Sequence, residues 1–126
     1  MSKKVEQARA DFLNYALTLP EAWEDHPWGD SVVKVRKKIF IFFGLGSVDD
    51  KKFKTLSFCV KLPGSCSEAL RREDAQPMGY GLGRSGWVRF DITAKNMPTQ
   101  AVLREWLEES YQAVAPKKLA RLLEPD

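Results

Sequence analysis

Histidine and cysteine, which supply most transition-metal ligands and many catalytic nucleophiles, are scarce in this sequence. The histidine is His26, and the two cysteines are Cys59 and Cys66. None of the three lies at the spacing of a zinc site, and no neighbouring residue marks either cysteine as an activated nucleophile. The sequence therefore predicts no metal, no cofactor and no enzymatic activity. Two reduced cysteines in a cytoplasmic protein are the simpler interpretation, and a disulfide is the alternative.

Long apolar runs are also missing. No segment reaches the length of a membrane span, and the N-terminal residues are charged where a signal peptide would be apolar. There is no internal repeat, low-complexity segment or linker, and a composition of 44% hydrophobic and 29% charged residues is typical of globular proteins. We therefore expect a soluble, cytoplasmic protein with a single domain over residues 1–126.

Apolar periodicity predicts helices near both ends of the chain and strands between them. Apolar residues recur every three or four positions from Val5 to Leu19, and again after Thr99, which is a suitable N-cap. Pro116 separates that second helix from a short last one. Strands are expected over residues 31–36, 39–43, 54–62 and 87–92, and a short helix over 65–74. This order predicts an α+β fold in which the N- and C-terminal helices cover one face of an antiparallel sheet.

Positive charge is concentrated in the predicted strands. Residues 32–62 carry a net charge of +6, whereas the whole chain sums to +3. Within this segment, Asp49 and Asp50 are expected to neutralise the neighbouring Lys51, Lys52 and Lys54 locally. A basic sheet surface indicates an anionic partner, and nucleic acid is the first candidate.

Strand alternation predicts which of these charges act together. If the apolar residues pack under the helices, basic and aromatic side chains share the opposite, open face of the sheet. The predicted nucleic-acid-binding residues are Lys34, Arg36, Lys61, Trp87 and Arg89, with Lys37 and Lys38 at a hairpin tip. The cations would neutralise phosphates and Trp87 would provide a stacking surface. Because side chains alternate along a strand, either the odd- or the even-numbered residues of 39–43 must also lie on this face. No base-reading helix is apparent, so we expect weak sequence specificity.

Three alternatives use the same residues. The face could be merely solvated, as in many antiparallel sheets covered on one side. It could bind a small anionic ligand, with Trp87 as the floor and Arg36 or Arg89 contacting the anion. The protein could also be an interaction module that pairs with another protein through an exposed strand edge or the glycine run. The glycine run Gly81-x-Gly83-x-x-Gly86 matches a dinucleotide fingerprint only formally, because a strand follows where that motif requires a helix.

The order of several short motifs resembles the MmcQ/YjbR-like family. The motifs are Glu24-Asp25-His26-Pro27-Trp28-Gly29, Val33-Lys34-Val35, Lys38-Ile39-Phe40, Leu56-Ser57-Phe58-Cys59-Val60-Lys61-Leu62-Pro63, Gly86-Trp87-Val88-Arg89-Phe90 and residues 103–123. The resemblance implies a CyaY-like α+β fold. It also implies a DNA-binding role, by fold-level analogy with the "double wing" domain of a phage transcription factor. Many relatives have a segment rich in His, Asn and Lys where this chain has the glycine-rich residues 79–86.

Overall fold

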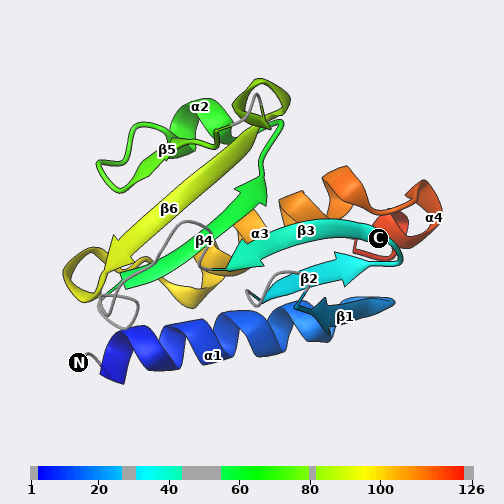
Figure 1. The fold of residues 1–126 in the computed structure, drawn as a ribbon, viewed down its shortest axis with the longest axis horizontal. Helices are drawn as coiled ribbons and strands as arrows, with labels where there is room; N and C mark the ends of the chain where they lie inside the picture. Colours follow the sequence, from blue (N-terminus) through cyan, green and yellow to red (C-terminus); the bar gives the residue numbers. More distant parts are fainter. Residues whose placement is uncertain (1–2, 27–30, 44–54, 80–81, 124–126) are drawn as a thin grey trace.

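The computed structural model describes residues 3–26, 31–43, 55–79 and 82–123, which form one sheet with helices before and after it (Figure 1). The elements in chain order are α1 (Lys3–Leu17), β1 (Ala22–Asp25), β2 (Val32–Val35), β3 (Lys38–Phe43), β4 (Thr55–Lys61), α2 (Cys66–Ala69), β5 (Ala75–Pro77), the 3₁₀ turn η2 (Leu82–Ser85), β6 (Trp87–Thr93), η3 (Ala94–Asn96), α3 (Gln100–Val114), α4 (Lys117–Ala120) and η4 (Arg121–Leu123).

Within the described ranges the sheet has six strands in the order β1-β2-β3-β4-β6-β5, and every neighbouring pair is antiparallel. The long helices α1 and α3 pack on the same face of it (Figure 1). The predicted α+β arrangement is therefore confirmed. In the part of the chain that the structure describes, no helix is both long and apolar enough to cross a membrane.

The hydrophobic core lies between the two long helices and the sheet. The ring centre of Phe12 of α1 lies 4.6 Å from that of Phe58. Phe58 stacks on Phe90 with ring centres 4.9 Å apart, and Phe90 stacks on Trp106 of α3 with ring centres 4.4 Å apart. These aromatic contacts connect α1 to the neighbouring strands β4 and β6 and to α3, and each adds to the stabilisation from burial of the rings. Thr99 caps α3 as predicted, because its hydroxyl accepts a hydrogen bond from the Val102 amide.

A register shift between β2 and β3 decides which side chains face the helices. Val33 pairs with Ile41, whereas Lys34 pairs with Ile39, so Phe40 has no partner on β2. Such a bulge interrupts simple alternation. Phe40 and Ile41 are consequently both fully buried in the core, and Phe42 packs against Trp87 on the other side of the sheet. The expectation that residues 39–43 alternate strictly between the two faces of the sheet is therefore wrong.

The hydroxyl of Ser110 closes the gap where β3 and β4 separate near this bulge. Its O–H donates to the Phe40 carbonyl at 2.5 Å, and its oxygen accepts from the Lys61 amide at 2.8 Å. Ser110 is fully buried on α3. One side chain from a helix thus satisfies two backbone groups of adjacent strands, which fixes α3 relative to the sheet.

Candidate nucleic-acid interface

Lys34 lies on the sheet face opposite the helices, as predicted, but it is already paired. Its ammonium is 2.8 Å from the Asp25 carboxylate of β1 and 5.1 Å from the centre of the Trp23 ring. The hydrogen bond from Lys34 lowers the pKa of Asp25, so the carboxylate remains ionised at neutral pH. The charge of Lys34 is therefore balanced locally by a strand that the sequence did not predict.

Arg89 also faces away from the helices and is also paired. Its guanidinium contacts the Asp91 carboxylate at 3.1 Å, and Asp91 accepts a second hydrogen bond from the Ser57 hydroxyl at 2.7 Å. The bond to Asp91 raises the pKa of Arg89. Arg89 lies opposite Cys59 in the β4–β6 register, and burial raises the pKa of the Cys59 thiol to about 12. A thiol that stays protonated at neutral pH is a poor nucleophile.

The middle of this face is buried, contrary to the open surface that the sequence predicted. Trp87 is only 8% exposed, and its ring packs at 5.3 Å against that of Phe42. Val32 and Cys59, which also lie outside the core under the helices, are 0% and 2% exposed. The predicted role of Trp87 as a stacking surface is therefore not supported, because a base could not reach its ring in this conformation.

The hairpin turn lies one residue earlier than predicted. β2 ends at Val35, which pairs with Lys38, so Arg36 and Lys37 form the turn and Lys38 begins β3. Arg36 has a φ of +56°, a conformation that few non-glycine residues adopt. Its carbonyl accepts a hydrogen bond from Trp23 Nε1 at 2.8 Å, which helps to hold this backbone. Arg36 therefore does not share the strand face with Lys34, and its guanidinium pairs with Glu21 at 3.1 Å.

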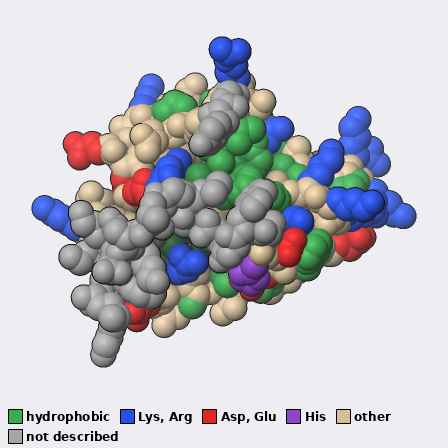
Figure 2. Space-filling model, in the orientation of Figure 1, with side chains coloured by type: hydrophobic (Ala, Val, Ile, Leu, Met, Phe, Trp, Pro, Cys, Tyr) green, Lys and Arg blue, Asp and Glu red, His purple; other side chains and the backbone are tan. Residues whose placement is uncertain are grey.

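Exposed cations gather at one end of the molecule, where the β2–β3 turn approaches the end of α3. Tyr111 of α3 joins the parts of this end: its ring packs edge-on against Phe40 at 5.2 Å, and its hydroxyl donates to the Pro20 carbonyl. Figure 2 shows Lys and Arg side chains clustered where Figure 1 places the turn and α4. We call this surface the cationic end; its residues are Arg36, Lys37 and Lys38 of the turn and Lys117, Lys118 and Arg121 of α4 and η4.

Most cations of the cationic end are exposed, and most have no ion-pair partner among the described residues. Lys37, Lys38, Lys117, Lys118 and Arg121 are exposed. The predicted Lys61 lies apart from them at the end of β4, in register with Trp87, and is half-buried. Within the described residues, Arg36 is the member of this set that takes part in an ion pair. The three cations of α4 and η4 were not part of the predicted set. Their signal in the sequence is a basic cluster that follows Pro116 closely, on a segment too short to show a periodic face.

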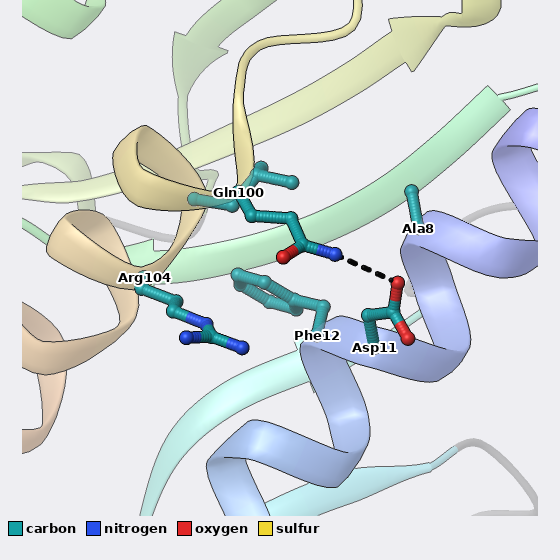
Figure 3. Close-up of a pocket in the computed structure, with 6 residues that line it drawn as sticks. Ala8, Asp11, Phe12, Gln100 and Arg104 are labelled. Carbon is teal, nitrogen blue, oxygen red and sulfur yellow. Dashed lines mark hydrogen bonds between the residues drawn. The ribbon is translucent and has the colours of Figure 1, made fainter.

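Two cavities beside α3 lie away from the predicted binding residues. One, between α1 and α3, has a volume of about 20 Å³, enough for a single water, and the Gln100 amide donates to Asp11 across it at 3.0 Å (Figure 3). A groove of about 380 Å³ between α2 and α3 is lined by Glu68, Glu105 and Glu109 together with Arg72 and Trp106. Neither contains a residue of the predicted binding set. The described ranges contain no cluster of three or more His, Cys, Asp or Glu side chains able to hold a metal.

The family model described as YjbR matches residues 17–113, from the last turn of α1 nearly to the end of α3. The match includes all six strands of the sheet and the β2–β3 turn, whereas α4 lies beyond it. No curated protein matches this chain.

Proposed function

The chain belongs to the YjbR family, and on this premise we propose that it is a non-enzymatic, cytoplasmic DNA-binding protein that contacts phosphates through its cationic end. The observation that carries this proposal is the set of exposed cations that the turn and α4 present together, most of them without an ion-pair partner among the described residues. Lys and Arg side chains that neutralise phosphates release condensed counterions, which drives association without reading base sequence. The resemblance to a double-wing domain agrees with such a role.

Local charge balance favours the cationic end over the predicted sheet face. Lys34 contacts the Asp25 carboxylate on the adjacent strand β1, and Arg89 contacts the Asp91 carboxylate on its own strand β6. A phosphate that bound either cation would have to compete with that carboxylate. Lys37 and Lys38 have no such competitor among the described residues. Glu21 pairs with Arg36 at this end, and the acidic Glu124 and Asp126 lie outside the described residues. Lys37 and Lys38 therefore stay in the proposed site, and Lys34, Trp87 and Arg89 leave it.

A salt titration of DNA affinity tests this proposal. Affinity for a fluorescent duplex of about 20 base pairs is measured by anisotropy as salt is raised. Replacing Lys37 and Lys38 together by Ala should make the log–log salt slope shallower by about 2 units if both side chains contact phosphate. Both residues are exposed, so the substitutions should leave the thermal unfolding temperature nearly unchanged.

The matched control removes the same charge elsewhere. Arg71 and Lys95 are exposed and lie near α2 and after β6, away from the turn and α4 (Figure 1). Their joint replacement by Ala should leave the salt slope unchanged. Equal effects of the two double variants would mean that only net charge matters. The proposal would be refuted if the wild-type protein bound neither duplex nor single-stranded DNA at low salt.

A further inference from the structure

Trp23 is an exposed aromatic side chain beside the cationic end. It lies in β1 and is 43% exposed, whereas Trp87, which the sequence had indicated, is 8% exposed. Its register partner on β2 is Lys34, and it is joined to the turn by the hydrogen bond from Nε1 to the Arg36 carbonyl. Trp23 thus combines an accessible ring with immediate proximity to the cations proposed to contact phosphate.

The ring is held in place before any ligand binds. The bond to Arg36 fixes the edge of the indole, and the Lys34 ammonium lies 5.1 Å from the ring centre, where it is held by Asp25 at 2.8 Å. A cation at this distance from a ring is an attractive contact. A side chain that is already ordered loses little conformational entropy when a ligand stacks on it. The contacts therefore favour a preformed stacking surface.

We propose that Trp23 stacks with an unpaired base while the cationic end contacts the flanking phosphates, so that the protein prefers single-stranded to duplex DNA. This inference rests on the proposed function and names the form of its partner. Bases in a duplex are stacked on one another and cannot reach a side chain at the protein surface, whereas the bases of a single strand can. Proteins that bind single strands combine cations for the backbone with aromatic rings for the bases.

Two variants of Trp23 separate stacking from structure. Trp23→Phe and Trp23→Leu both remove the hydrogen bond to Arg36, but only the first keeps an aromatic ring. Affinities are measured for an oligothymidylate of about 12 nucleotides and for a duplex of similar length. Trp23→Leu should weaken single-strand binding by roughly 5- to 100-fold relative to Trp23→Phe, because each base–aromatic contact contributes on that scale. Duplex affinity should differ by less than about twofold between the two variants.

The outcomes distinguish this inference from the proposed function. Equal single-strand affinities of the two variants, with salt-dependent binding retained, would overturn the stacking role and leave phosphate binding standing. Equal losses on single strand and duplex would also overturn it, since stacking requires an unpaired base. If the wild-type protein bound neither the single strand nor the duplex, both the stacking role and the proposed function would be overturned. Thermal unfolding of the two variants should agree to within a few degrees, which excludes a folding defect in one of them.

Discussion

Neighbouring charges decide what each basic residue can do. Lys34, Arg36 and Arg89 each lie within about 3 Å of a carboxylate, and two of those carboxylates come from β1 or the residue before it. Alternation along β2 correctly placed Lys34 on the face away from the helices. It could not reveal Asp25 as the partner, because residues 22–25 show no alternation of their own and become a strand only by pairing with β2. The distribution of charge along the chain therefore identifies the basic segment but not which of its side chains are paired with carboxylates.

The two cysteines should differ sharply in reactivity. Cys59 is buried on the sheet and Cys66 is partly exposed at the start of α2, and both are free thiols. Iodoacetamide at about pH 8 should alkylate Cys66 and spare Cys59, because burial raises the pKa of Cys59 to about 12 and blocks access. Mass spectrometry of the peptides measures this. Rapid labelling of Cys59 in the folded protein would contradict the packing around Trp87 and Phe42.

The raised pKa of the Cys59 thiol predicts that the free energy of unfolding decreases at high pH. The Cys59 thiol has an ordinary pKa of 9.0 when unfolded and about 12 when folded. The unfolded chain therefore loses this proton first as pH rises. The contribution of Cys59 to the free energy of unfolding is complete below about pH 9 and is lost progressively between about pH 9 and pH 12.

Elements differed in how far the sequence specified them. The long helices, the central strands and the short last helix follow from apolar periodicity, because each buries one side against the core. The edge strands β1 and β5 were missed, since each is short and gains its structure from one neighbour. The bulge at Phe40 was missed because it depends on the pairing of two strands and on Ser110 of α3. The bulge changes which side chains of β3 face the core, and the β2–β3 turn lies one residue earlier than the sequence predicted.

Ser110 should be important for the stability of the β3–β4–α3 junction. Ser110→Ala removes the hydroxyl that bonds the Phe40 carbonyl and the Lys61 amide, and leaves two backbone groups without their partner. We expect a loss of about 1–3 kcal/mol in the free energy of unfolding, measured by urea denaturation. The control Ser67→Ala replaces an exposed serine of α2 and should change stability by less than about 0.5 kcal/mol. Equal effects of the two substitutions would show that the bridge contributes little.

The whole molecule places cations from distant parts of the chain on one surface. The turn between β2 and β3 and the segment after Pro116 are about 80 residues apart in sequence, and the packing of Tyr111 against Phe40 and Pro20 brings their elements together. The sequence could predict each basic cluster separately. Their proximity depends on how α3 crosses the sheet, which no local pattern encodes. The stacking residue Trp23 was missed for the same reason, because its position beside the turn requires β1 to pair with β2.

The most direct test of this account asks whether the turn and α4 contact one DNA molecule together. A variant with Lys37, Lys38, Lys117 and Lys118 all replaced by Ala is compared with the Lys37/Lys38 double variant in the anisotropy titration. If the cationic end acts as one surface, the quadruple variant should make the log–log salt slope shallower by about 4 units and the double variant by about 2. Equal slopes for the two variants would contradict the account, because α4 would then lie outside the DNA contact.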